Sequence, residues 1–217
     1  MTLVERWLSA LNLAADELRL SACHDLIARY EEPHRKYHNL RHLTEVLDIV
    51  DELADEAEDI EAVRLAAWFH DAVYESAAAH SESEISESAI SNEEASARLA
   101  ARVLTDLGVP AARASEAARL VRLTEKHVAA DHDRNAAVLF DADLAILASA
   151  PERYEEYAQA VREEYRQVPD DVFRPARARI LAALLSAPTL YRTPSARARF
   201  ESRARTNVTA EIARLSS

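Results

Sequence analysis

Glycine is almost absent from this chain, which has a single one, Gly108, among its 217 residues. Tight hairpin turns and glycine-rich nucleotide loops need residues at positive φ, where glycine alone escapes a steric penalty. A β-rich fold is therefore disfavoured, and a phosphate-binding P-loop or a dinucleotide fingerprint is excluded because each needs several glycines. Alanine, leucine, glutamate and arginine abound instead. These residues favour helices, so we predict an all-α protein.

The bulk composition is typical of a folded, soluble protein. Hydrophobic residues make up 49% of the chain and charged residues 29%, which argues against disorder over the whole length. A net charge of −12 argues against nucleic acid or a membrane as partner, since basic patches bind both. The one cysteine, Cys23, fits a reducing compartment. No apolar run suits a signal peptide or a membrane span, so we expect a cytoplasmic protein.

Apolar residues recur at helical spacing along almost the whole chain. The segment 40–50 carries a clear apolar stripe, and Ala62–Val73 is apolar enough for a buried helix. With no internal repeat or long linker, we predict one domain over residues 1–217 with roughly nine to ten helices. Beyond a first helix around Leu3–Leu11 and a second ending before Pro33, the later ones are predicted at Asn92–Leu107, Ala111–Lys126, Asn135–Leu147, Glu152–Gln167, Val172–Leu185 and Ser195–Leu215.

One stretch interrupts this pattern. Residues 75–91 are rich in serine, alanine and glutamate, and we predict a flexible surface loop there, with a lid over a site as one role for it. The amphipathic terminal helices are compatible with a homodimer. Nothing in the sequence separates dimerisation from packing within one chain.

Histidine and aspartate residues gather in a few helical segments. His38 and His42 lie at i and i+4 and would share one side of a helix. The pair His70-Asp71 lies toward the end of the predicted buried helix. Ionisable groups there are costly unless they are paired or bind a metal. A purely structural role for these histidines in a helical bundle is the competing interpretation.

Two further carboxylates, Asp141 and Asp143, lie in the apolar segment 138–147, where the same argument applies. Three separate helices thus each carry a group that suits a divalent ion. Imidazole and carboxylate ligands together fit Mn, Fe, Co or Zn, with Mg as a further option, and they argue against a thiolate zinc site.

The order His, His-Asp, Asp resembles the signature of the HD superfamily of metal-dependent phosphohydrolases. This resemblance covers nearly the whole chain and is to a bacterial subgroup described as predicted metal-dependent HD phosphohydrolases. It implies an HD-domain helical bundle, and it implies no particular substrate. The serine-rich stretch before Asn92 departs from the subgroup's pattern. The matching blocks are Tyr37–His42, Ala67–Tyr74, Asn92–Ala97, Thr124 with His127, Asp141–Leu144, Val161–Tyr165 and Arg203–Asn207.

Carried over residue by residue, the resemblance implies that His42, His70 and Asp71 are three ligands of one divalent ion. For the fourth we predict Asp141, because hydrophobic residues follow it at the spacing found in related HD enzymes. Asp143 is the alternative. The extra histidines also permit a binuclear site.

These residues lead to a hydrolase prediction. We expect Asp71, Glu93 or Glu94 to orient an attacking water. The substrate would be a phosphate ester or anhydride of a small metabolite, with a nucleotide as the main candidate. A di-iron oxygenase or lyase on the same fold and a non-catalytic nucleotide or metal sensor are the alternatives. Candidate groups for binding the phosphoryl oxygens are His38, Arg41, Lys126, His127 and Arg162. The alternative for Arg162 is a structural ion pair that connects two helices.

Overall fold

The computed structural model describes residues 1–75 and 90–216, and all regular structure within these ranges is helical. The predicted all-α class is therefore confirmed. Two short 3₁₀ helices, η1 (Ala54–Glu56) and η3 (Leu144–Ala148), accompany the longer helices. The α-helices of the described ranges are α1 (Leu3–Leu11), α2 (Glu17–Tyr30), α3 (Leu40–Glu52), α4 (Ile60–Phe69), α5 (Asn92–Asp106), α6 (Ala111–Leu123), α7 (Arg134–Asp143), α8 (Pro151–Glu164), α9 (Asp170–Ser186) and α10 (Pro194–Leu215).

Local sequence explains where most of these helices begin. A side-chain oxygen at the N-cap accepts a hydrogen bond from a backbone amide of the first turn, which would otherwise lack a partner. Thr2 and Glu5 form a complete capping box at the start of α1. The side-chain caps are Thr2, Asp16, Asn39, Asp59, Ser91, Asp133 and Thr193.

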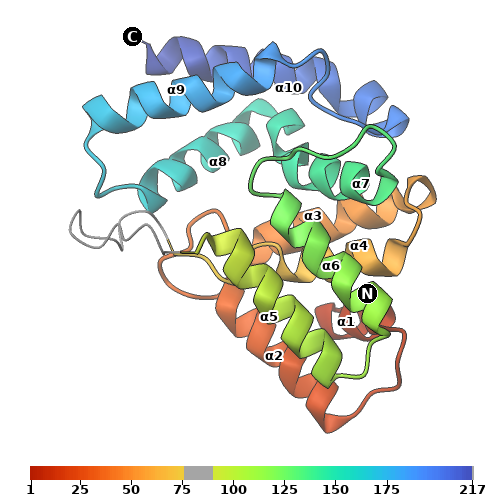
Figure 1. Ribbon diagram of the computed structural model, residues 1–217. Coiled ribbons are helices and arrows are strands. Elements are labelled where there is room, and N and C mark those ends of the chain that lie inside the picture. The colour runs from red at the N-terminus through yellow and green to blue at the C-terminus, as the bar shows by residue number, and fades with distance from the viewer. Residues whose placement is uncertain (76–89, 217) are drawn as a thin grey trace.

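The buried helix α4 is the centre of the N-terminal part of the fold. It is apolar apart from Glu61 and Arg64, and it contacts α1, α3, α5, α6 and α7. Figure 1 shows these helices gathered around it. Trp68 of α4 meets Trp7 of α1 edge to face, with 5.4 Å between the ring centroids. A helix enclosed in this way places whatever follows its last residue inside the protein.

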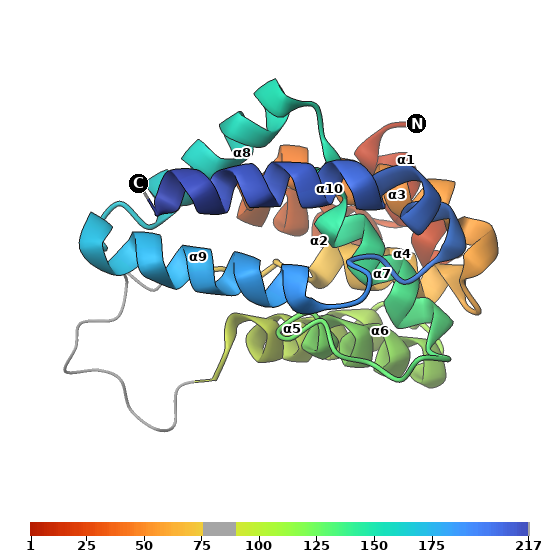
Figure 2. The same ribbon diagram turned by 90° about the horizontal axis from the view of Figure 1, so that it is seen from above.

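The C-terminal helices form a second group beside this centre. α10 runs along α9, as Figure 2 shows, and it also contacts η3, the continuation of α7. The hydrophobic core is continuous between the two groups and extends from Trp7 in α1 to Val208 in α10. No helix in the described ranges is both long enough and apolar enough to cross a membrane.

Four predicted helices end three or four residues earlier than expected, at Phe69, Leu123, Asp143 and Glu164, and two of these ends matter for the site. The helix predicted at Ala62–Val73 stops at Phe69, because side chains replace the next turn. His70 donates from Nδ1 to the Ala67 carbonyl at 2.8 Å, and the Tyr30 hydroxyl donates to the Trp68 carbonyl at 3.2 Å. The helix predicted at Asn135–Leu147 stops at Asp143, where the chain tightens into η3.

The predicted loop 75–91 lies mostly outside the described residues. Its two ends are tied together by Glu75 and Asn92, which exchange hydrogen bonds of 3.1 Å and 3.0 Å between backbone and side-chain amide. Asn92 is the first residue of α5, so α5 begins close to the residues that follow α4.

Gly108 ends α5 as the sequence predicts. Its φ is +80°, in the left-handed region, and the amide of the next residue, Val109, donates to the Leu104 carbonyl at 3.0 Å. This turn reverses the chain, so that α6 packs along α5. Asn12 ends α1 in the same conformation, with φ +53°.

We expect Gly108→Ala to lower the free energy of unfolding by about 1–2 kcal/mol, because a β-carbon is strained at this φ. No atom lies within 4 Å of the added carbon, so the cost comes from the backbone alone. Urea denaturation measures it. Gly108→Asn is the matched control and should cost less, since asparagine tolerates this conformation, as Asn12 shows. Equal stability of wild type and Gly108→Ala would contradict the assignment.

Candidate metal centre

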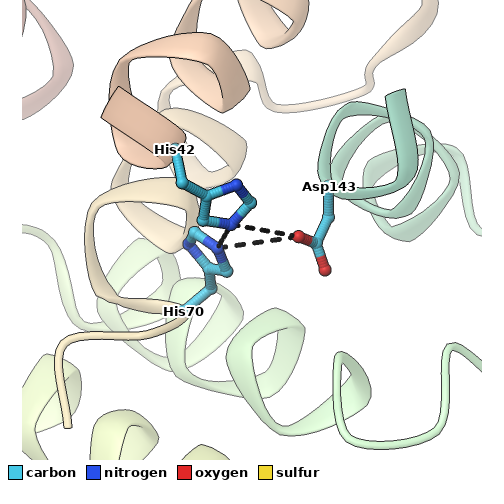
Figure 3. Close-up of side chains that lie close together, drawn as sticks. All are labelled: His42, His70 and Asp143. Carbon is cyan, nitrogen blue, oxygen red and sulfur yellow. Dashed lines mark hydrogen bonds and ion pairs between the residues drawn. The ribbon is translucent and has the colours of Figure 1, made fainter. Parts of the chain in front are cut away.

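Three helix ends converge on one point in the core. His42 lies in the first turn of α3, His70 follows the last residue of α4, and Asp143 is the last residue of α7. Figure 3 shows the three side chains directed toward one another from separate helices. Asn39 sets the position of His42, because its side chain caps the α3 turn that carries this histidine.

The distances within the cluster are short. The Nε2 atoms of His42 and His70 are 3.0 Å apart. An oxygen of Asp71 lies 3.4 Å from His42 Nε2 and 3.1 Å from His70 Nε2. An oxygen of Asp143 lies 3.4 Å and 3.8 Å from the same two nitrogens. Both imidazoles are buried, with 2% and 1% of their side-chain surface exposed, and each carboxylate is 18% exposed.

These separations fit ligands of a single divalent ion. Ligand atoms about 2.0–2.2 Å from one ion, at angles of about 90–109°, are about 2.8–3.6 Å from one another. All the measured pairs fall within that range except His70 with Asp143, which is slightly longer. His42, His70 and Asp143 form a group whose ligand atoms could hold a metal ion, and Asp71 lies against the same two nitrogens.

Protonation states support the same arrangement. The Ala67 carbonyl can only accept a hydrogen bond, so the nearby Nδ1 of His70 carries the proton and its Nε2 offers a lone pair. Burial lowers the pKa of His42, but hydrogen bonds with Asp143 and Asp71 outweigh it and raise the pKa to about 9. Burial alone raises the pKa of Asp71, yet the His70 and His38 imidazoles hold it well below the ordinary value. A cation, a proton or a metal ion, is therefore stabilised between these groups.

The structure reverses the expected choice of aspartate. Asp141 points away from the histidines and accepts hydrogen bonds from the backbone amides of Arg192 at 2.8 Å and Thr193 at 2.7 Å. It is fully buried, and burial raises its pKa against the effect of these amides. Asp141 thus fixes the turn before α10, while Asp143, two residues further along the chain and on another face of the helix, joins the cluster.

A histidine–glutamate pair lies next to the cluster. His38 Nδ1 is 2.7 Å from an oxygen of Glu164, which is only 5% exposed. The other oxygen of Glu164 accepts the backbone amides of Lys36, Tyr37 and His38 at 2.8–3.0 Å. Burial raises the pKa of Glu164, but the His38 bond and these amides outweigh it and lower the pKa to about 2. His38 is thus held by an ionised carboxylate.

Aromatic rings enclose the histidines. Tyr37 lies with its ring centroid 4.6 Å from that of His42, and Tyr74 stacks on His38 at 4.3 Å. The Tyr74 hydroxyl donates to Glu164 at 2.9 Å. The Tyr37 hydroxyl is buried and has no hydrogen-bond partner among the residues that the structure describes. A buried hydroxyl without a partner beside the cluster is available to a bound ligand or water.

Of the other groups proposed from the sequence, His127 reaches the cluster. Its Nε2 lies 3.0 Å from the second oxygen of Asp143, and its backbone has a φ of +49°, which is uncommon for residues other than glycine. Lys126, next to it, is exposed. Glu93 is half-buried in the first turn of α5.

Three predicted residues are engaged elsewhere. Arg41 pairs with Glu45 and Glu156 on the surface. Arg162 pairs with Asp170 and donates to two carbonyls after α8, which is the helix-tying role rather than substrate binding. Glu94 accepts hydrogen bonds from Arg98 and Arg122 at 2.6 Å each, so its carboxylate is occupied. We do not retain these three as site residues.

The sequence reasoning did not find the role of Glu164. It lies among charged neighbours between Arg162 and Arg166, so its burial has no signature in the sequence. Tyr37 was visible only as the residue before His38. No family model, curated protein or solved structure matches this chain.

Substitutions of the two aspartates should have different effects on metal binding and on stability. Asp143→Ala should weaken binding of Mn²⁺ or Zn²⁺ by about 10–100-fold or more. Asp141→Ala should keep the metal but lower the free energy of unfolding by about 1–3 kcal/mol, because two buried amides lose their acceptor. Elemental analysis after reconstitution and urea denaturation give the two readouts. Loss of metal in Asp141→Ala with normal binding in Asp143→Ala would restore the original prediction.

Glu164 should contribute pH-dependent stability. Its ordinary pKa is 4.5 and its folded pKa is about 2. A carboxylate whose pKa is lowered by folding stabilises the protein above the unfolded pKa, and the contribution is lost as the pH falls through the folded value. The shift corresponds to about 3 kcal/mol at neutral pH. We therefore expect Glu164→Gln to be less stable than wild type at pH 7, with a gap that shrinks by roughly half toward pH 3.

The measurement is urea denaturation of both proteins at pH 7, 5, 4 and 3. Glu163→Gln is the matched control, because the Glu163 side chain is 51% exposed and pairs only on the surface, with Arg166. If Glu164→Gln were as stable as this control at pH 7, or if its deficit did not change with pH, the proposed anchoring role would be wrong.

Proposed function

We propose that this protein is a metal-dependent phosphohydrolase that cleaves a phosphate ester or anhydride of a small metabolite, with a nucleotide as the main candidate. The observation that carries the proposal is the buried group of His42, His70, Asp71 and Asp143 beside the His38–Glu164 pair. The resemblance of the sequence around these residues to HD phosphohydrolases is consistent with it.

A divalent ion held by this group would lower the pKa of bound water from about 15.7 toward about 7 and would polarise a phosphoryl oxygen. The protein's own contribution begins with a rigid ligand set, since each ligand is at the end of a helix packed in the core. Asp71 remains ionised at neutral pH because the neighbouring imidazoles lower its pKa. Its carboxylate can therefore accept a hydrogen bond from the attacking water and orient it.

His38 is the group best placed to serve the leaving group. The hydrogen bond between Nδ1 and Glu164 fixes the orientation of the ring and leaves Nε2 for proton transfer to the leaving group. The His38 side chain is 24% exposed, so that a substrate can reach it. On the far side of Asp143, His127 is a second imidazole that can bind a phosphoryl oxygen.

The di-iron alternative has one observation in its favour. Asp143 turns one oxygen to the two ligand histidines and the other to His127, as a bridging carboxylate would. A second ion needs further donors near His127, and the described part of the chain forms a single group of metal-binding side chains, at His42, His70 and Asp143. We therefore place a mononuclear hydrolase first.

The protein purified without a histidine tag and reconstituted with Mn²⁺, Fe²⁺, Co²⁺ or Zn²⁺ should release phosphate from at least one nucleotide. His70→Ala and Asp71→Ala should lose metal and activity together. His38→Ala should keep the metal and lower kcat by about 10²–10⁴-fold, the contribution of a general acid. His132→Ala, at an exposed histidine, is the matched control and should behave as wild type. Full activity in Asp71→Ala, or two equivalents of iron with oxygen consumption and no phosphate release, would refute the hydrolase.

A further inference from the structure

A groove opens beside the metal centre, between α3, η3 and the start of α8. Its volume is about 270 Å³, and His42 and Asp143 are among its lining residues. Two of the candidate ligands therefore form part of the groove wall, so a molecule that lies in the groove is adjacent to the metal centre. The volume is slightly below the range of about 300–1,000 Å³ that is usual for ligand sites, which suits one small organic group.

Much of the groove wall is apolar. Val46 and Ile49 of α3 face Ala142, Ala145 and Ile146 across it. Burial of apolar ligand surface against such a wall stabilises binding, whereas the wall provides no hydrogen-bond donor or positive charge for a phosphate. This part of the groove therefore suits an organic ring.

The acidic residues at the groove are already paired. Glu45 forms an ion pair of 2.8 Å with Arg153, Asp48 pairs with Arg6, and Glu52 pairs with Arg199. Among the described residues, these pairs leave no arginine at the groove free for an anion, and the carboxylates repel an anion. A chain of further phosphates is thus disfavoured in the groove, and a neutral group is favoured.

One residue of the groove wall carries a buried polar atom that has no partner among the described residues. The Ser149 Oγ atom is buried and makes no hydrogen bond within residues 1–75 and 90–216. Buried polar atoms are nearly always hydrogen-bonded, so such an atom in the wall of a groove points to a ligand that completes it. A hydroxyl both donates and accepts, and it would match the polar edge of a ring or a sugar hydroxyl.

We propose that this groove binds the neutral organic part of the substrate, and that this part is the nucleoside of a nucleotide. The phosphate then lies at the metal centre, the ring contacts the apolar wall, and Ser149 bonds its polar edge. The inference rests on the proposed function, because that function supplies the phosphate to which the nucleoside is joined. It adds the side from which the substrate approaches and the class of its organic group.

The test measures binding and does not depend on turnover. The probes are adenosine, guanosine, cytidine, uridine and inorganic phosphate, each titrated by calorimetry into the metal-loaded full-length protein. Ala145→Trp fills the groove, and Ser149→Ala removes only the hydroxyl, so the second variant remains informative if the first misfolds. Ala112→Trp, on the exposed side of α6, is the matched control.

At least one nucleoside should bind wild type and Ala112→Trp equally. The Kd of that nucleoside should rise at least about tenfold in Ala145→Trp, because the indole ring fills the groove. It should rise about 3–10-fold in Ser149→Ala, which loses one hydrogen bond. Inorganic phosphate should bind all four proteins alike. Nucleoside binding that both groove variants leave unchanged would overturn the inference, and so would the absence of nucleoside binding to wild type.

The two proposals can fail separately. Nucleotide hydrolysis that both groove variants leave unchanged would defeat the groove assignment and leave the hydrolase intact. Nucleoside binding that is lost in the groove variants, together with no phosphate release from any nucleotide, would defeat the hydrolase and support the groove as a nucleoside site.

Discussion

Two imidazole nitrogens face each other at 3.0 Å in the helical core, and much of the surrounding structure serves to make this contact tolerable. Lone pairs at that distance repel unless a cation lies between them or a proton is shared. The protein supplies two carboxylates, Asp71 and Asp143, whose charge favours a cation there. Without a metal the cation is a proton, which is why the pKa of His42 rises to about 9. The same charges that favour this proton also favour a divalent ion.

The helices hold these groups through their ends rather than their middles. α4 stops at Phe69 because side chains take over its last carbonyls, and this frees His70 and Asp71 from the helix to turn toward the other ligands. α7 stops at Asp143 for the same purpose, where η3 begins. A helix end gives a side chain more directions than a helix interior does, while the packed helix behind it keeps the position fixed.

Glu164 connects the centre to the rest of the fold. Its carboxylate binds three consecutive backbone amides before α3 together with His38 and Tyr74, so it orders the turn that leads into the His42 helix. The groove lies between α3 and η3 and has His42 in its wall. In the proposed arrangement the phosphate meets the metal centre and the nucleoside, which is the leaving group, follows α3, so that one helix organises both parts of the substrate.

The sequence by itself determined the helical class, most of the helix positions and three of the candidate ligands. The near absence of glycine, the 3.6-residue apolar period and the N-cap residues are local signals, and local signals survive without tertiary contacts. The turn at Gly108 was readable for the same reason.

Only the tertiary structure decided that Asp143, and not Asp141, faces the histidines. It also placed Glu164 in the core next to His38. Of the predicted phosphate-binding groups, it brought His127 to the cluster and left Arg41 and Arg162 paired elsewhere. Asp141 and Asp143 lie two residues apart in one apolar segment, and a helix turns by about 200° between them, so the choice depends on which face meets α3. That depends on the packing of α7 against α3 and α4. Partners far apart in the sequence, such as residues 38 and 164, are brought together by the whole fold, and no local pattern encodes them.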